Sequence, residues 1–257
     1  MRNLIYCLSI VILLGSCEAS IVNEFVPNNG PTTQSGSYST MLTLGDILYL
    51  VNDREISTFN ISDSKNPKKL DSQTVGFAIE SLIHYEGLLL IGSASNMYIY
   101  EIQSNGIPKR KSVTRYFGAD QSVCASDPIV VRNQLAYVTL SQFNDVVNCR
   151  QVISNELRVY DISNLNQPKL LTRLGLKGPK GLALGKNNLY VCDGKGGLAI
   201  IDITDPTKPK LKLRLEGFNA FDAIVKGNLL IISAEKQLVQ YDITDENNIK
   251  WLGKIDL

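Results

Sequence analysis

Short apolar or alternating segments recur along the chain from about residue 37 to its end, separated by turns rich in Gly, Asn, Asp and Pro. Each unit of the pattern has a short alternating segment, a turn, an apolar segment, a second turn, another apolar segment, a polar turn and a last segment. Segments of this length and composition predict β-strands. Beyond the first seventeen residues no segment keeps a helical period, so the pattern predicts an all-β protein with four strands per unit.

The second strand of each unit follows a turn that contains Gly or Asn, residues that tolerate the positive φ of tight hairpins. We expect the second strands at residues 47–51, 88–91, 135–139, 189–192 and 229–232. The third strands are short and rich in β-branched and apolar residues, which predicts that they are buried. Examples lie at residues 198–203 and 238–243.

The polar turn after the third strand is itself a repeat, with the sequence DITDPTKPKL at residues 202–211. Its opening residues are separated by 41, 60, 41 and 40 positions, and they are Asn60, Glu101, Asp161, Asp202 and Asp242. A period near 40 residues indicates an array or a propeller, and four antiparallel strands per period are typical of a propeller blade. The sequence therefore predicts a β-propeller of five four-stranded blades, with one insertion in the third.

The chemistry of this turn suits the start of an outermost strand. Proline stands seven positions after the opener in four units, Ile249 replaces it in the fifth, and lysine always follows. Asp or Asn caps backbone donors of a turn, and proline fixes φ where an edge strand leaves its amide side unpaired. Asn60 and Glu101 depart from the aspartate, and we expect looser turns there.

The text Leu198-Ala199-Ile200-Ile201-Asp202 resembles the LVIVD repeat of bacterial extracytoplasmic β-propeller proteins, and the resemblance covers residues from about 37 to 257. It implies an exported propeller and says little about activity. We predict blades at about residues 37–76, 77–119, 120–178, 179–218 and 219–257. The stretch 21–26, IVNEFV, is either an added strand that closes the ring or an extended linker.

The first residues, MRNLIYCLSIVILLGSC, have the layout of an export signal: Arg2, an apolar run from Leu4 to Leu14, and small residues before Cys17. The run of 11 residues is too short for a spanning helix, which needs about 20. LGSC resembles the lipobox of bacterial lipoproteins. This resemblance predicts a signal peptide at residues 1–16 and a lipidated, palmitate-bearing Cys17; the alternative is an ordinary secretory signal with an incidental cysteine.

Residues 17–36 carry the lipid and a tether rich in Ser, Thr, Asn, Pro and Gly, which is typical of a flexible linker. We therefore predict a lipid-anchored protein of the bacterial cell envelope, in the outer membrane on either face. The 257 residues are 44% apolar and carry 26 Lys and Arg against 25 Asp and Glu. A chain of this length can bury a large core, and its balanced charge predicts no nucleic-acid partner. We expect a monomer.

The insertion of the third unit lies between Thr139 and Leu157, on the face opposite the repeated turn. Cys124, in the link from the second blade, projects to the same face. Exported proteins oxidise their thiols, so we predict a disulfide between Cys124 and Cys149; two free cysteines are the alternative. Cys192 is left over, and its place at the end of an apolar strand predicts a buried filler.

A loop pinned in this way is a candidate binding loop, because long loops on rigid scaffolds commonly carry recognition. Its candidate residues are Phe143, Asn144, Asp145 and Arg150. Neutral drift in a surface loop is the alternative, since loop insertions cost little free energy. The sequence predicts a non-catalytic scaffold that binds an envelope protein or glycan through this face.

Candidate catalytic chemistry is sparse. His84 is the only histidine and lies in the first strand of the second blade, so we predict no metal site and no cofactor. The alternative function is a hydrolase or lyase that uses acidic residues near strand ends, such as Asp53, Asp193 or Glu235. A purely structural component of the envelope is a third possibility. The five lysines of the repeated turns could attract an anion, but solubility and local Asp–Lys pairing are the simpler account.

Overall fold

The computed structural model describes residues 40–117, 125–126, 128–142 and 155–257. The described residues all belong to one compact unit. The predictions for the signal peptide, Cys17 and the strand at residues 21–26 lie outside the described residues. In the described part no helix is long and apolar enough to cross a membrane.

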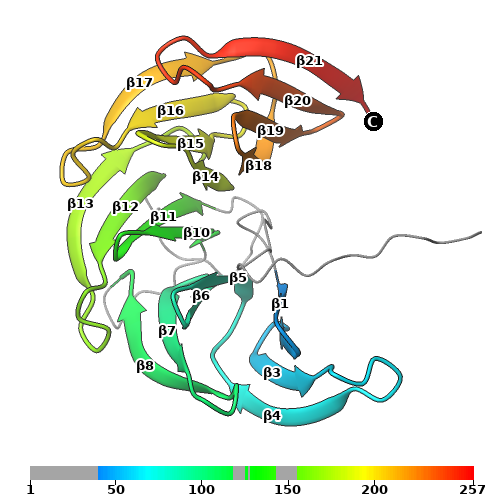
Figure 1. The fold of residues 1–257 in the computed structure, drawn as a ribbon. Coiled ribbons are helices and arrows are strands. Elements are labelled where there is room, and N and C mark those ends of the chain that lie inside the picture. Colours follow the sequence, from blue (N-terminus) through cyan, green and yellow to red (C-terminus); the bar gives the residue numbers. More distant parts are fainter. Residues whose placement is uncertain (1–39, 118–124, 127, 143–154) are drawn as a thin grey trace, which may run out of the picture. The chain divides into compact units, whose positions relative to one another are not determined.

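Strands are the only regular elements in the described ranges, and they form five antiparallel sheets (Figure 1). The first sheet contains β1 (Met41–Leu44), β2 (Ile47–Val51), β3 (Glu55–Asn60) and β4 (Lys68–Thr74), and the second contains β5 (Ile79–Tyr85), β6 (Leu88–Ser93), β7 (Asn96–Ile102) and β8 (Pro108–Arg115). The third contains β9 (Ala125–Ser126), β10 (Ile129–Arg132), β11 (Leu135–Gln142), β12 (Glu156–Asp161) and β13 (Lys169–Gly175). The fourth contains β14 (Leu182–Leu184), β15 (Asn188–Cys192), β16 (Leu198–Asp202) and β17 (Lys210–Leu215), and the fifth contains β18 (Ala220–Lys226), β19 (Leu229–Ala234), β20 (Gln237–Asp242) and β21 (Lys250–Asp256).

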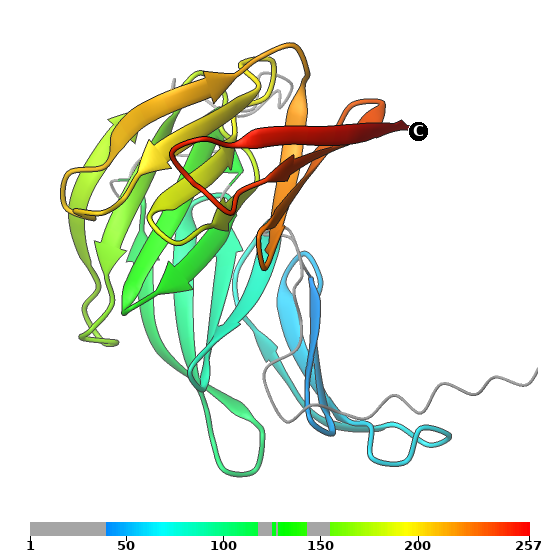
Figure 2. The same ribbon diagram turned by 45° about the horizontal axis from the view of Figure 1, so that its top comes forward.

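Each sheet is a meander whose strands pair in chain order (Figure 2). β9 adds a short pairing to the end of β11. The all-β class and the five four-stranded units of a β-propeller are confirmed. The predicted second strands correspond to β2, β6, β11, β15 and β19, which begin within one residue of the expected positions.

The core consists of four clusters, each shared by two consecutive sheets. In β6, Leu88 and Leu90 pack toward the third sheet, while Leu89 and Ile91 pack toward the first. Because successive side chains of a strand point to opposite faces, a strand between two neighbours is apolar at every position. The strands of the first and fifth sheets contribute one face each, and no cluster of described residues joins these two sheets.

The repeated turn is closed by the predicted cap in four sheets. The Oδ1 atoms of Asn60, Asp161, Asp202 and Asp242 each accept a hydrogen bond from the backbone N–H two residues later, at 2.8 to 2.9 Å. Glu101 is the exception. Its carboxylate accepts from Gln103 Nε2 at 3.3 Å and lies 3.4 Å from Lys111 Nζ.

Every outer strand carries a β-bulge at its third position or one residue further. In all five sheets the register shifts between the two residues of the third strand that come just before the opener of the repeated turn. One residue of the outer strand is therefore left without a partner in the third strand. The bulged residues are Leu70, Lys111, Leu171, Lys212 and Leu252. A bulge increases the local twist and makes an edge strand a poor template for pairing.

The repeated turn also contacts the preceding sheet. The Tyr49 hydroxyl in β2 donates to Gly106 O, in the turn of the second sheet, at 2.7 Å. Glu246, in the turn of the fifth sheet, accepts from the backbone N–H groups of Lys186 and Asn187 at 2.7 Å and from the Tyr190 hydroxyl at 3.2 Å. We call this second arrangement the Glu246 clamp. It fastens the fifth sheet to the β14–β15 hairpin of the fourth.

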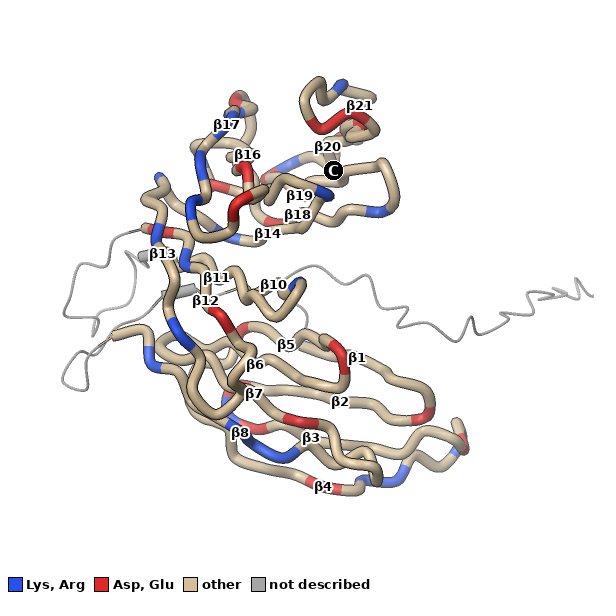
Figure 3. The backbone as a smooth tube through the Cα atoms, turned by 60° about the vertical axis from the view of Figure 1, so that its left-hand side comes forward, with Lys and Arg blue, Asp and Glu red and all other residues tan. Residues whose placement is uncertain are grey.

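The lysines that follow the turns are exposed residues of the outer strands. They are Lys68, Lys109, Lys169, Lys210 and Lys250. Other basic residues accompany them, so Lys and Arg gather along outer strands such as β8, β13 and β17 (Figure 3). Among the described residues no ion pair joins these five lysines to a carboxylate; the pair found within a turn is Lys208 with Asp205, at 3.9 Å. Charged side chains on an edge strand oppose aggregation.

Candidate functional site

The candidate site lies where β11 ends and β12 begins, on the face opposite the repeated turns. The loop residues Phe143, Asn144, Asp145 and Arg150, and both Cys124 and Cys149, lie outside the described residues. The strand that follows Cys124 is nevertheless placed: in β9, Ala125 pairs with Gln142 and Ser126 with Ser141, at the end of β11. β9 therefore lies beside the end of β11, where the insertion starts.

A buried ion pair lies at the other end of the insertion. In β12, Arg158 is 2% exposed and Glu156 is 5% exposed. Arg158 Nε donates to Glu156 Oε1 at 2.7 Å, and its Nη1 donates to Tyr116 O at 2.6 Å. The guanidinium carbon also lies 4.8 Å from the centroid of the Phe117 ring. Because Tyr116 and Phe117 follow β8, this pair joins the second and third sheets beneath the insertion.

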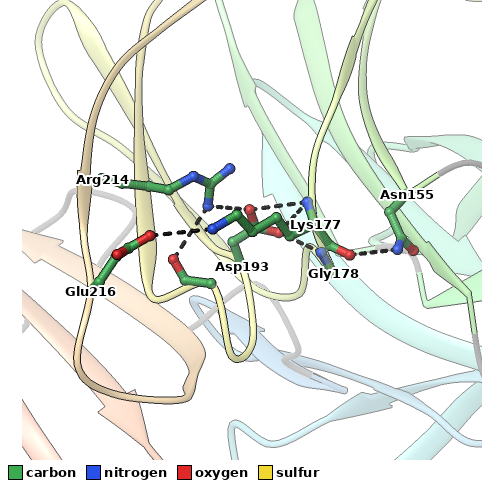
Figure 4. Close-up of polar contacts among 7 residues, drawn as sticks. Asn155, Lys177, Gly178, Asp193, Arg214 and Glu216 are labelled. Carbon is green, nitrogen blue, oxygen red and sulfur yellow. Dashed lines mark hydrogen bonds and ion pairs between the residues drawn. The ribbon is translucent and has the colours of Figure 1, made fainter.

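A second polar network joins the third sheet to the fourth (Figure 4). Asp193 follows β15, and its side chain is fully buried. One carboxylate oxygen accepts from the backbone N–H groups of Lys177 and Gly178, at 3.0 and 2.6 Å, and the other forms an ion pair with Arg214. A buried carboxylate surrounded by donors is held in place, because removing any donor exposes its desolvation cost.

This network continues outward to the end of the insertion. Asn155, the first described residue after the insertion, donates from Nδ2 to Lys177 O at 2.6 Å. Lys177 Nζ lies 3.2 Å from Glu216 Oε1, and both of these side chains are exposed. We call Asn155, Lys177, Gly178, Asp193, Arg214 and Glu216 the Asp193 platform. Its Lys177–Glu216 ion pair is exposed, and its Asp193 carboxylate is buried.

Two glycines make room for the Asp193 platform. At Gly197, φ is +75° and a Cβ atom would lie 2.0 Å from Leu215 O. At Gly196, a Cβ atom would lie 2.9 Å from the Lys177 Cδ atom. The loop between β15 and β16 therefore requires glycine at 197 for both conformation and space.

The three acidic candidates for catalysis occupy different environments. Asp53 is 70% exposed at its side chain and lies 3.4 Å from Arg54 Nε. Glu235 accepts from Asn219 Nδ2 at 3.3 Å on the surface. Asp193 is buried in its platform. Within the described ranges no hydrogen bond or ion pair joins any two of them, and no group of three or more His, Cys, Asp or Glu residues could hold a metal ion.

Of the two remaining sequence candidates, His84 is partly buried and Cys192 is fully buried. His84 is in β5, and its Nε2 accepts from the Gly87 N–H at 3.2 Å; burial lowers the pKa of the imidazole. Cys192 is fully buried in the cluster between the fourth and fifth sheets, as predicted, and burial raises the pKa of its thiol well above the ordinary value.

Sequence reasoning missed the Arg158–Glu156 pair, although a signal exists. The third strand of that unit reads ELRVYD. Two residues of opposite charge, Glu156 and Arg158, therefore lie on the same side of a strand predicted to be buried. The residues at the same distance from the opener in the other four sheets are Ser57, Tyr98, Ala199 and Val239, none of which is charged. A charged residue at an apolar position of a repeat predicts a buried partner.

The model of the LVIVD repeat matches residues 152–174 and 180–216. These segments include β12, all of β13 except its last residue, and the whole fourth sheet, and they contain Asn155, Asp193, Arg214 and Glu216 of the Asp193 platform. Sequence comparison finds no match among the curated proteins.

Solved structures of similar fold share little sequence with this chain. A Lactobacillus plantarum protein has a TM-score of 0.65 at 15% identity, covering 84% of this chain and 69% of its own. The periplasmic gluconolactonase PpgL of Pseudomonas aeruginosa has a TM-score of 0.60 at 10% identity, covering 82% and 69%. BamB of Moraxella catarrhalis has a TM-score of 0.52 at 11% identity, covering 75% and 54%, so this chain spans about half of that one. These likenesses show the fold.

Proposed function

This chain is an LVIVD-repeat protein with a β-propeller fold, and from that premise we propose that it is a non-catalytic binding scaffold of the bacterial cell envelope. In this proposal the chain is a lipoprotein anchored in the outer membrane through Cys17. It binds a protein or a glycan with the face that carries the insertion of the third sheet. The export signal, the LGSC sequence and the polar tether support the anchoring.

The support for binding at this face is the rigid frame on both sides of the insertion. The Arg158–Glu156 pair and the Asp193 platform bury charged groups close to the end of the insertion, where the described chain resumes at Asn155. Buried charges are costly unless they are paired, and a site on a well-supported frame is better positioned than one on a free loop. Recognition residues commonly lie on loops held by such scaffolds.

The non-catalytic part of the proposal is supported by the carboxylates. Asp193 has donors on both oxygens, so it is occupied by the fold, and Asp53 and Glu235 are exposed residues without a shared partner. General acid–base catalysis requires a carboxylate within hydrogen-bond reach of the substrate. We therefore favour binding over the hydrolase or lyase alternative.

A crosslinking experiment tests the binding face. A photo-crosslinking amino acid replaces the exposed Glu216 in the full-length protein expressed in cells, and a matched variant carries it at Asp245, in a repeated turn on the opposite face. A third variant combines the Glu216 probe with a short Gly-Ser linker in place of residues 143–154. The linker joins Gln142 to Asn155, so β11 and β12 are kept.

We expect a discrete crosslinked product from position 216 that is absent from position 245 and disappears when the insertion is replaced. Crosslinks of equal yield from both faces, or an unchanged product after replacement of the insertion, would show that this face is not the binding surface. Circular dichroism of each variant checks that the β-sheet content is unchanged.

A further inference from the structure

A cavity of about 390 Å³ lies at the ends of the strands opposite the insertion, between the second and third sheets. Its walls are the β5–β6 hairpin turn, the β10–β11 hairpin turn, the end of β7 and the repeated turn of the third sheet. A volume of this size is within the range of small-ligand pockets. Nothing in the proposed function uses this end of the molecule.

The two hairpin turns that line the cavity are conformationally unusual. Glu86 has φ of 45° and Gln134 has φ of 58°, a region that L-residues other than Asn and Asp seldom adopt. The position of Glu86 is taken by Gly45 in the first sheet and by Gly227 in the fifth, and the position of Gln134 is taken by Gly87 in the second. The chain therefore places a long polar side chain at each of two positions where glycine serves elsewhere, and both side chains border the same cavity.

Glu101 is the third departure from the repeat, and it lines the cavity too. The openers of the other four turns cap their own backbone, whereas the Glu101 carboxylate accepts from Gln103 Nε2 and pairs with Lys111. Hydrogen bonding by Gln103 and the charge of Lys111 lower its pKa, so the carboxylate is ionised at neutral pH. Three positions at which the chain departs from its own repeat thus meet at one cavity.

The lining has acceptors and an apolar floor but no cation. Glu86 has no ion-pair or hydrogen-bond partner among the described residues, whereas the Glu101 carboxylate accepts from Gln103 and interacts with Lys111 and, more weakly, with Lys109. Leu88, Ile162 and Leu165 supply the apolar surface. A ligand that satisfies this lining carries a compact positive charge on an aliphatic stem, because the charge pairs with the carboxylates and the stem covers the floor.

We propose that this cavity binds a primary alkylammonium group, with the ammonium at the carboxylates of Glu86 and Glu101 and the alkyl stem against Leu88, Ile162 and Leu165. The group belongs either to a free small amine or to the lysine side chain of a bound peptide. The chemistry at the cavity is the same in both cases.

Nuclear magnetic resonance titration of the full-length protein tests the proposal at the site itself. The probes are n-pentylamine and its neutral counterpart 1-pentanol, followed by 1,5-diaminopentane and Nα-acetyl-lysine methylamide. We expect pentylamine to shift the backbone amide signals of Gly87 and Gln134, and pentanol to bind roughly tenfold more weakly or not at all. Tighter binding of the diamine supports a free amine as the ligand, and tighter binding of the lysine derivative supports a peptide.

Three variants assign the effect to the carboxylates. Glu86→Gln and Glu101→Gln each weaken pentylamine binding by roughly three- to tenfold, as expected for a partly exposed charge contact. Glu86→Gly removes the carboxylate and the conformational strain together, so it loses binding without losing stability. Asp46→Asn, which removes an exposed carboxylate from the equivalent hairpin of the first sheet, leaves binding unchanged.

The proposal is overturned if none of the three amines shifts these signals at tens of millimolar, if pentanol binds as tightly as pentylamine, or if Asp46→Asn weakens binding as much as the two glutamate variants do. Each of these results is separate from the crosslinking outcome at the insertion face, since the two sites lie at opposite ends of the strands.

Discussion

At the scale of single residues, this fold places its buried charges between sheets. Arg158 and Glu156 lie between the second and third sheets, and Asp193 lies between the third and fourth. Each charge has an oppositely charged partner and further hydrogen bonds, and these interactions offset the desolvation free energy of the buried charge. The single-residue consequence is that removal of one partner costs far more than removal of both.

Arg158→Met keeps an unbranched side chain but removes the cation nearest to the buried Glu156 carboxylate, which then keeps only Arg173 Nη1, at 4.0 Å. We expect a loss of about 3–5 kcal/mol in the free energy of unfolding, measured by equilibrium denaturation in urea. The double variant Glu156→Leu with Arg158→Met removes both charges, so we expect it to be more stable than the single variant. Glu216→Ala, which breaks an exposed pair, is the control and changes the stability little. A double variant less stable than Arg158→Met would refute this account.

The pH dependence of stability near neutrality should come from His84, the only histidine. Burial lowers its pKa from 6.5, and its Nε2 must be unprotonated to accept from the Gly87 N–H. The unfolded chain therefore binds a proton at a higher pH than the folded chain does, and stability falls as the pH is lowered through 6.5. The urea midpoint should decrease between neutral pH and the folded pKa.

His84→Gln removes the titrating group, and the midpoint of this variant should be nearly constant over the same pH window. A wild-type midpoint that rises on acidification across this window would contradict the direction argued here, because it requires a folded pKa above the unfolded one.

Residue roles could be predicted from the sequence where the repeat itself supplies the comparison. The capping by Asp202 and Asp242 follows from their place after a strand, and the burial of Cys192 follows from the apolar run that it ends. The contacts of Arg158 with Tyr116 O and of Arg214 with Asp193 could not be predicted, because these partners lie 42 and 21 residues away and only the packing of neighbouring sheets brings them together.

At the scale of elements, the repeated turn and the outer strand after it form one device. The Asx cap closes the turn, proline stands at or just before the first residue of the strand in four sheets, and a bulge follows within a few residues in all five. The cap and the proline were predictable from turn chemistry. The bulge was not, because the outer strands are largely exposed and have no strict alternation of buried and exposed residues that would record a one-residue register shift.

The Glu246 clamp shows that the turn also holds sheets together. Glu246→Ala leaves the backbone N–H groups of Lys186 and Asn187 without their acceptor, so we expect a loss of about 1–3 kcal/mol in unfolding free energy. Asp205→Ala, which removes a cap confined to its own turn, should cost less. Urea denaturation measures both losses. Faster amide exchange at Lys186 and Asn187 in the Glu246 variant distinguishes the clamp from a general loss of stability, and equal exchange in the two variants would argue against it.

At the scale of the whole molecule, the fold class and the five units could be predicted because one short text recurs at a fixed period. The order of strands in each sheet then follows from short connections between antiparallel neighbours. The sharing of cores between sheets could not be assigned to particular residues, since a continuous apolar run gives no indication of which face meets which neighbour. The lipid anchor, the Cys124–Cys149 disulfide and the binding loop stay predictions.

Radiolabelled palmitate supplied to cells that express the full-length protein should label it, and Cys17→Ala should abolish the label because the acyl chains are attached at the first residue after signal cleavage. Cys7→Ala, which changes a cysteine inside the signal, is the control and should leave labelling intact. Label that persists in the Cys17 variant would exclude this attachment site.

Successive side chains of β6 and β15 point to opposite faces, so each of these strands contributes to two core clusters. The stability of each sheet therefore depends mainly on contacts with its neighbours. When every unit is stabilised mainly by its nearest neighbours, opening begins at the units that have one neighbour and travels inward. Amide hydrogen exchange should therefore be slowest in β6, β11 and β15 and fastest in β2 and β19, with uniform protection across all five strands as the contrary result. The first and fifth sheets can therefore unfold locally while the central sheets stay folded. A partner that binds the third and fourth sheets would contact the part of the protein with the highest free energy of local unfolding.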